Sequence, residues 1–210
     1  MYFNDRRDAA NKLSQALAPY KDNKNTIVIG IPKGGIEIGF YISKNLHLPL
    51  SYILTKKIGH PDMQEYAIGV VSVDDVFLDQ EQLESENIPK LYIESEIQRI
   101  RERLKKSSKN YPLITANYTD KTIILTDDGI ATGKTMLLTL KLLKQKKPKK
   151  IVIAIPVGPS FSIELIKELA DEVICLYTPV EFLGISQFYS EFSQLDDAQV
   201  ESYLRVANGV

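Results

Sequence analysis

Short apolar runs alternate with amphipathic stretches along this chain. Five runs are typical of buried strands: Thr26–Ile31, Leu50–Leu54, Lys121–Thr126, Ile151–Ile155 and Val173–Tyr177. Apolar residues at helical spacing predict a first helix capped by Asn4 or Asp5 and ended by Pro19, then helices over about 36–46, 80–108 with a break at Pro89, 133–146 and 161–170. This alternation predicts an α/β fold with an open, mostly parallel sheet flanked by helices, whose ligands bind outside the carboxyl ends of the strands.

One stretch departs from the alternation. Residues Thr55 to Glu65 are polar and contain Gly59 and Pro61, which predicts an exposed loop. The segments Ala67–Val73 and Asp75–Leu78 follow, and they predict a strand pair joined at Asp74-Asp75.

Composition narrows the class of protein. The chain has 210 residues, 44% of them apolar, which predicts a single domain over 1–210. Its 26 Lys and Arg against 27 Asp and Glu argue against a protein that coats nucleic acid. One cysteine, Cys175, excludes an internal disulfide framework. Because no apolar stretch is long enough for a membrane span and the first residues lack the order of a secretory signal, we expect a cytoplasmic protein with no membrane partner.

The segment Ile123–Thr135 carries the most chemical information. A buried strand ends at Asp127 and Asp128, which we call the acidic pair, and a helix follows shortly after. Consecutive backbone N–H groups at such a helix start, with the hydroxyls of Thr132 and Thr135, make a site for one phosphate. The acidic pair suits vicinal sugar hydroxyls, or Mg²⁺ through water. A phosphate site beside a diol-accepting acidic pair describes a ribose 5-phosphate.

Two other interpretations of this segment fit less well. Gly133-Lys134-Thr135 matches the end of a Walker phosphate loop, but only three residues separate Gly129 from Gly133 where four are needed. Two adjacent carboxylates would also repel a triphosphate. Alternatively, the acidic pair begins a bare turn and Thr132 caps the helix, although two acids are a poor choice for a bare turn after a buried strand.

These residues resemble the phosphoribosyl pyrophosphate (PRPP) signature of type I phosphoribosyltransferases, in which an apolar strand, two acids and a small Thr/Gly loop follow one another. The resemblance implies that Asp127 and Asp128 hold the ribose as catalytic residues, and that the 5-phosphate is bound by Ala131, Thr132, Gly133, Lys134 and Thr135. It also implies Mg²⁺ as the cofactor, held by the substrate and through water to the acidic pair, with no direct protein ligand expected. Thr126 and Gly129 depart from the family pattern, where an aliphatic and a branched apolar residue are usual.

A second loop agrees with this resemblance. Ile29–Gly35 is a strand followed by Pro-Lys-Gly-Gly, and it resembles the pyrophosphate loop of the same family. Backbone N–H groups at Gly34 and Gly35 can approach an anion closely because no Cβ intervenes, and Lys33 adds charge for the leaving pyrophosphate. Taken alone, these residues are ordinary turn chemistry. Their order and distance from the first motif strengthen the interpretation.

The segment Thr55–Gly69 stands where this family carries a mobile loop that closes over the donor. Lys56 or Lys57 would act in catalysis by neutralising the pyrophosphate, while closure excludes competing water. The alternative is a solvated surface loop. This segment and the stretch Phe182–Phe192 also resemble an uncharacterised bacterial branch of phosphoribosyltransferase-like proteins. The resemblance to the phosphoribosyltransferase fold implies a small hood built from about 176–210, with the N-terminal helix as a second candidate contributor.

Other residues carry weaker signals. His47 and His60 do not have metal-ligand spacing, and His60 stays a candidate acid or base. A basic run at a helix end is typical of a solvated face, with nucleic-acid binding as the alternative: Lys141, Lys144, Lys146, Lys147, Lys149 and Lys150. Four aromatic residues suit a core or an oligomer contact, a homodimer included, with an acceptor pocket as the alternative: Phe182, Phe188, Tyr189 and Phe192.

We therefore expect a phosphoribosyltransferase, a glycosyltransferase of the pentosyltransferase class. It would transfer ribose 5-phosphate from PRPP to a nitrogen acceptor, by preference a nucleobase, and release pyrophosphate. Its partners would be PRPP and a small-molecule acceptor that the sequence does not identify. We expect no nucleic-acid partner. Two alternatives stay open: a regulator or sensor that binds PRPP without catalysis, and a nucleotide hydrolase that uses Gly133-Lys134-Thr135.

Overall fold

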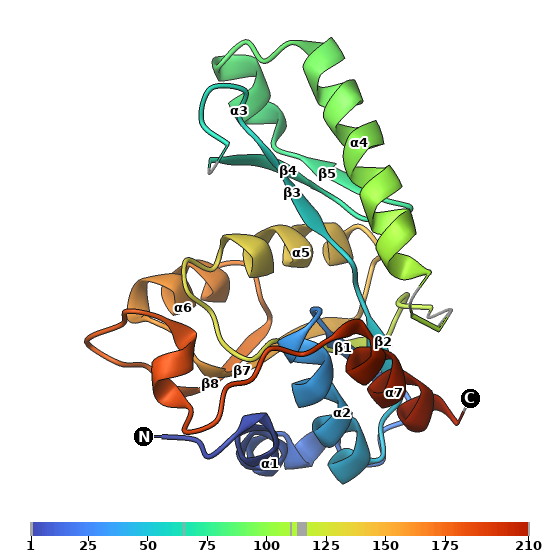
Figure 1. Ribbon diagram of the computed structural model, residues 1–210, viewed down its shortest axis with the longest axis vertical. Coiled ribbons are helices and arrows are strands. Elements are labelled where there is room, and N and C mark those ends of the chain that lie inside the picture. The colour runs from blue at the N-terminus through green and yellow to red at the C-terminus, as the bar shows by residue number, and fades with distance from the viewer. Residues whose placement is uncertain (1, 65, 110, 113–116, 210) are drawn as a thin grey trace.

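The computed structural model of the chain, which describes residues 2–64, 66–109, 111–112 and 117–209, has a body and a smaller lobe (Figure 1). The body contains a five-stranded parallel sheet in the order β2-β1-β6-β7-β8. Its strands are β1 (Thr26–Gly30), β2 (Leu50–Tyr52), β6 (Thr122–Thr126), β7 (Lys150–Val157) and β8 (Glu172–Tyr177). The predicted fold class, an open and mostly parallel sheet flanked by helices, is confirmed.

Helices cover both faces of this sheet because the strands are apolar on both faces. One face carries α1 (Arg6–Ala16), α2 (Gly34–Leu46) and α7 (Asp197–Asn208), and the other carries α5 (Lys134–Lys144) and α6 (Ser160–Lys167). Side chains of β1 alternate between them, since Val28 packs in the first cluster while Ile27 and Ile29 pack in the second. A short 3-10 helix, η1 (Ala18–Tyr20), follows α1, which Asp5 caps as predicted.

The smaller lobe, which we call the small lobe, is built on the antiparallel sheet β3-β4-β5. Its elements are β3 (Lys56–Gly59), β4 (Ala67–Val71), β5 (Val76–Leu78), α3 (Gln80–Ser85) and α4 (Lys90–Ser108). One side of this sheet packs on α3 and α4 around Ile58 and Ile100. On the other side, Val70 packs in one cluster with Leu138 and Leu142 of α5. Helix α5 therefore lies between the two sheets (Figure 1).

The strand β3 corrects the loop predicted over Thr55–Glu65. Lys56 and Lys57 pair with Val71 and Val70 of β4, and the side chain of Ile58 is fully buried. The polar pattern misled because β3 is an edge strand, on which exposed lysines are common. The connecting segment is shorter than predicted, and its residue Glu65 lies outside the described residues.

After β8 the chain runs from one edge of the sheet to the other before α7 begins (Figure 1); we call residues 178–196 the tail. The tail contains the 3-10 helix η2 (Ile185–Phe188). Main-chain bonds join it to the N-terminal segment, because the N–H of Phe3 donates to Phe188 and the N–H of Ser190 donates to Phe3, each at 2.8 Å. The hood predicted over 176–210 includes the tail and α7, and its last residue lies outside the described residues. No helix within the described ranges is both long and apolar enough to cross a membrane.

Candidate active site

The acidic pair lies directly after β6, at the carboxyl edge of the parallel sheet. Asp127 Oδ1 accepts the backbone N–H of Asp128 at 2.9 Å, and the N–H of Gly35 also donates to Asp127. Burial, followed by the charge of Asp128, raises the pKa of Asp127 well above its usual range. Burial also raises the pKa of Asp128, against the opposing effect of Arg6. Two crowded carboxylates of this kind are suited to ligands that donate hydrogen bonds or carry a cation.

The loop after β1 closes on the acidic pair. A β-carbon on Gly34 would lie 1.9 Å from Oδ2 of Asp128, and one on Gly35 would lie 2.9 Å from Cα of Asp127. Only residues without a side chain allow this approach. Both glycines already belong to the first turn of α2, so the loop is shorter than predicted. The structure thus brings the predicted ribose and pyrophosphate residues into direct contact.

Lys33 extends from the same loop toward α7. Its Nζ lies 3.0 Å from Oδ1 of Asp197, and both side chains are about half exposed. Tyr111 also donates to Asp197 at 3.4 Å, and burial followed by the Asp197 charge raises the pKa of Tyr111 to about 12. An exposed ion pair of this kind contributes about 1 kcal/mol or less. A pyrophosphate anion would therefore compete with Asp197 for Lys33 at modest cost.

The predicted phosphate loop, 131–135, leads from the acidic pair into α5. Helix α5 begins after Gly133, whose φ is 74°, and none of the described side chains caps its first turn. The interpretation in which Thr132 caps the helix is therefore wrong. The Oγ of Ser162 donates to the carbonyl of Ala131 at 2.6 Å and holds the loop. Exposed side chains surround the open helix start: Ala131, Thr132, Lys134 and Thr135. This geometry suits one phosphate group.

Both departures from the family pattern have local causes. A β-carbon on Gly129 would lie 2.7 Å from the side chain of Ile185, so the missing branched residue leaves room for η2. The Oγ1 of Thr126 donates to the carbonyl of Ala154 at 2.6 Å, which satisfies a buried hydroxyl. The tail then contacts the acidic pair directly, because Tyr189 donates to the carbonyl of Asp128 at 2.6 Å.

Arg6 is a buried cation at the acidic pair that sequence reasoning missed. It is 6% exposed, and its Nε donates to Oδ2 of Asp128 at 2.8 Å. The helical spacing of the first residues could have identified Arg6 as a buried residue. Arg6 shares one face of α1 with the buried residues Ala10, Leu13 and Leu17, so an arginine stands where an apolar residue is expected.

Lys56 and Lys57 stand on the edge strand β3 of the small lobe, with both side chains exposed. Successive residues of a strand point to opposite faces, so the two lysines do not form an equivalent pair toward one ligand. The tip of the β3–β4 hairpin lies beside the phosphate loop instead. There Lys134 Nζ is 5.7 Å from the ring centroid of Tyr66.

His60 is held within the small lobe. Its Nδ1 accepts the N–H of Asp62 at 3.1 Å, and its Nε2 lies 3.0 Å from Oε2 of Glu86. The ring is 8% exposed and lies 6.3 Å from the ring of Tyr66. Both ring nitrogens therefore have partners, and these contacts hold the His60 ring in place at the base of the hairpin tip.

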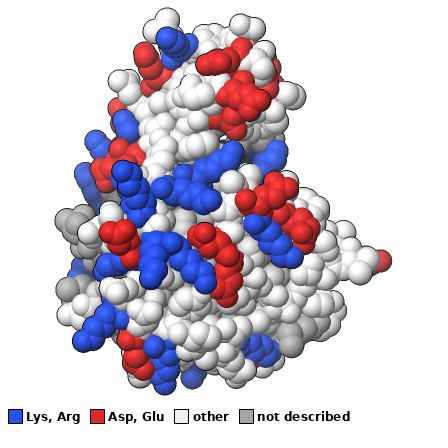
Figure 2. Space-filling view, turned by 180° about the vertical axis from the view of Figure 1, so that it is seen from behind, with Lys and Arg blue, Asp and Glu red and all other residues white. Residues whose placement is uncertain are grey.

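Some lysines of the basic run at the end of α5 form ion pairs. Lys141 lies 3.5 Å from Asp79, and Lys146 lies 2.5 Å from Asp75, so both lysines join α5 to the small lobe. Where charged side chains gather on the face shown in Figure 2, basic and acidic groups lie side by side, and a large part of that face is uncharged.

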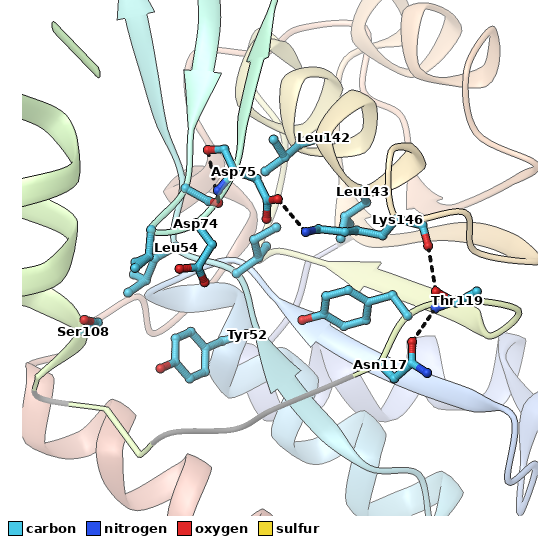
Figure 3. A pocket seen from close by; sticks show the side chains of 14 residues that line it. Tyr52, Leu54, Asp74, Asp75, Ser108, Asn117, Thr119, Leu142, Leu143 and Lys146 are labelled. Carbon is cyan, nitrogen blue, oxygen red and sulfur yellow. Dashed lines mark hydrogen bonds and ion pairs between the residues drawn. The ribbon is translucent and has the colours of Figure 1, made fainter. Parts of the chain in front are cut away.

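A cavity of about 390 Å³ lies where the small lobe meets β2 and the end of α5 (Figure 3). Tyr52 and Asp74 are among the residues that line it, and the ion pair of Asp75 with Lys146 borders it. None of its lining residues within the described part of the chain belongs to the predicted donor site. The cavity is therefore separate from the acidic pair.

The acidic pair fits Mg²⁺ as an ion that is shared between protein carboxylates, water and substrate phosphates. Within the described ranges, no three His, Cys, Asp or Glu side chains gather to hold a metal ion. Mg²⁺ needs no such cage, since it commonly binds through one or two carboxylates, several waters and the phosphates of a substrate. Asp127 and Asp128 supply oxygen atoms of the right kind.

Comparisons with known proteins agree with this geometry. The family model described as a phosphoribosyl transferase domain matches residues 3–189. Two proteins of Mycobacterium tuberculosis, from strains CDC 1551 and H37Rv and both named "Putative phosphoribosyl transferase", are 32% identical to this chain over 210 residues, which is 96% of the chain and 46% of each relative. The chain thus spans about half the length of the curated relatives it matches. The crystal structure of the protein TT1426 from Thermus thermophilus superposes with a TM-score of 0.87 at 31% identity, covering 97% of this chain and 98% of that one.

Proposed function

Because the chain belongs to the phosphoribosyl transferase domain family, we propose that it transfers ribose 5-phosphate from PRPP to a nitrogen acceptor and releases pyrophosphate. The observation that carries the proposal is the contact between Gly34 and Asp128. It sets the candidate pyrophosphate loop against the candidate ribose acids at one edge of the sheet. The open start of α5, a candidate site for the 5-phosphate, follows a few residues after the acidic pair.

The donor would lie across three loops. Asp127 and Asp128 accept hydrogen bonds from the ribose hydroxyls, and residues 131–135 hold the 5-phosphate through backbone N–H groups and hydroxyls. The N–H groups of Gly34 and Gly35 hold the pyrophosphate, together with Lys33 once it leaves Asp197. When bound, Mg²⁺ supplies charge neutralisation for the pyrophosphate, with Asp127 and Asp128 as its candidate protein contacts through water.

The reaction breaks the bond from the anomeric carbon to the pyrophosphate oxygen and forms a bond from that carbon to nitrogen. Positive charge develops on the sugar ring as the leaving group departs. In this proposal Asp127 would stabilise that charge, while Lys33 would balance the charge on the leaving pyrophosphate. Most of the protein's contribution is positioning, because the leaving group is already activated.

The acceptor would bind on the tail side of the acidic pair. We propose a nucleobase, because residues Ile185–Phe192 place aromatic side chains next to Asp128 and reach it through the hydroxyl of Tyr189. A planar ring stacks well on aromatic side chains. The same tail and α7 would then serve as the hood, and one of the exposed lysines of β3, Lys56 or Lys57, would neutralise the pyrophosphate.

Two measurements test the proposal. Calorimetry with PRPP and Mg²⁺ should give saturable binding, and pyrophosphate release should depend on at least one member of a panel of nucleobases and other amines. Binding without release for any acceptor would contradict the transferase and support a PRPP sensor. No binding of PRPP would contradict the donor site itself.

A further inference from the structure

We propose that Arg6 is a positioning residue of the donor site, which holds the Asp128 carboxylate in the orientation that receives the ribose. This inference rests on the proposed function, because it concerns the same acidic pair. It assigns a role to a residue of the N-terminal helix, which lies 122 positions from Asp128 along the chain.

The guanidinium group contacts three partners through two of its nitrogens. Its Nε donates to Oδ2 of Asp128 at 2.8 Å, and one terminal nitrogen donates to the carbonyl of Ser193 at 2.9 Å. The same terminal nitrogen lies 3.5 Å from Oε2 of Glu37 on α2. Because the donors of a guanidinium are fixed in one plane, these bonds together set the direction from which Asp128 is held.

The tail fixes the guanidinium in turn. The ring of Phe192 covers Arg6, with its centroid 4.1 Å from Cζ. Phe192 packs on Tyr189, whose ring centroid is 5.0 Å away and whose hydroxyl bonds the backbone of Asp128. Arg6 is thus immobilised between the tail and the acidic pair, which is the arrangement expected of a group that orients another.

The charge of Arg6 matters for the same reason. Asp127, Asp128 and Glu37 crowd one site, and the donor brings several more negative charges. The guanidinium of Arg6 offsets part of this negative charge, while the hydroxyls of Tyr189 and Tyr203 donate to the carbonyl of Asp128 and to Glu37. An ionised carboxylate offers about four lone-pair positions. One bond to Arg6 therefore leaves Asp128 with capacity to accept a ribose hydroxyl.

A purely structural role would also place a buried arginine here, as a tie between α1 and the tail. The two roles differ in which ligands they affect. If Arg6 only ties α1 to the tail, replacing it would weaken the binding of every ligand or of none. If Arg6 acts through Asp128, replacing it would weaken the binding of ligands that contain ribose and leave the binding of free pyrophosphate unchanged.

The experiment measures the affinity of PRPP, ribose 5-phosphate and pyrophosphate, each with Mg²⁺, by calorimetry on the full chain. Arg6→Gln should weaken PRPP and ribose 5-phosphate about tenfold and change pyrophosphate less than about twofold. Arg6→Lys keeps the charge and should recover part of the loss. Arg7→Gln, on the exposed side of the same helix, is the matched control and should bind all three ligands as the wild type does.

A double-mutant cycle decides whether Arg6 acts through Asp128. The variant Arg6→Gln with Asp128→Asn should bind PRPP no more weakly than Asp128→Asn alone, because the interaction is already lost. Additive losses, an equal loss for pyrophosphate, or unchanged binding in Arg6→Gln would each overturn the proposal. If Arg6→Gln does not fold, as judged by thermal unfolding, the same comparison of ligands in Arg6→Lys decides the matter. Failure of the wild type to bind PRPP would instead contradict the proposed function.

Discussion

Gly34 and Asp128 approach so closely that a β-carbon on the glycine would lie 1.9 Å from the carboxylate Oδ2. The parallel register creates this contact, because Gly30 of β1 lies beside Thr126 of β6 and both strands therefore end at the same edge. The loops that follow the two strands then meet. A contact between them joins the candidate pyrophosphate and ribose sites into one surface.

Replacing Gly34 by alanine should therefore disable the donor site. The added methyl group must push the Asp128 side chain away, and we expect PRPP binding to weaken at least about tenfold, or ~1.4 kcal/mol. Calorimetry with Mg²⁺ and PRPP measures the change. Gly184→Ala is the control, because nothing lies within 4 Å of a β-carbon at that position. Equal PRPP affinity in Gly34→Ala and Gly184→Ala would contradict the assigned contact.

Lys33→Met should weaken pyrophosphate binding several-fold while changing stability little. The ion pair of Lys33 with Asp197 is half exposed, so its loss should cost less than about 1 kcal/mol of the free energy of unfolding. Urea unfolding and pyrophosphate titration measure the two effects, with the exposed Lys24→Met as control. The assignment of Lys33 fails if both variants bind pyrophosphate alike.

Asp127→Asn should bind PRPP more weakly and yet be more stable than the wild type at neutral pH. Burial raises the pKa of Asp127 above the ordinary 3.8, so the folded protein binds this proton more tightly than the unfolded chain does. The free energy of unfolding therefore falls as the pH rises from about 3.8 through the raised pKa, and it stays lowered above that. Asparagine carries no such penalty.

The gain in Asp127→Asn should appear as a higher Tm, by roughly 2–4 °C for each kcal/mol in a chain of this size. It should be present at pH 7 and vanish at a pH below the unfolded pKa, where both proteins are neutral at this position. Thermal unfolding across pH measures it. A Tm at pH 7 equal to or below that of the wild type would show that the buried carboxylate is not a source of instability.

Gly129→Val restores the branched residue that is usual in the family and should nonetheless destabilise this protein. The new side chain would overlap Ile185, which a β-carbon at position 129 already approaches to 2.7 Å. Overpacking of this kind costs about 1–3 kcal/mol. Removing the obstruction in Gly129→Val with Ile185→Ala should recover part of the loss in urea unfolding. A single variant as stable as the wild type would mean that η2 moves freely from the loop.

The fold was predictable from the sequence because its strands are buried on both faces and its helices carry clear apolar stripes. The helical break at Pro89 and the turn at Asp74-Asp75 were likewise predictable from local chemistry. β3 was not, because its lysines face solvent at a sheet edge and only the pairing with β4 makes them a strand. Pairing between distant residues leaves no local pattern.

Part of the candidate site was also predictable from the sequence, and part was not. Asp127, Asp128 and the loops around Gly34 and Gly133 follow strand ends, where the parallel sheet must bring them together. The role of Arg6 was not predictable, because its partners Asp128 and Ser193 come from segments far along the chain. The direction in which Lys33 extends was not predictable either, because its partner Asp197 belongs to α7, far along the chain.

The most direct test of the account is the affinity of Asp128→Asn for PRPP with Mg²⁺, measured by calorimetry beside the wild type. Asp74→Asn, which changes an exposed acid on the β4–β5 turn, is the matched control. If Asp128 receives the ribose, PRPP affinity falls about tenfold or more in Asp128→Asn and stays unchanged in Asp74→Asn. Equal affinity for PRPP in all three proteins would contradict the assignment of the acidic pair.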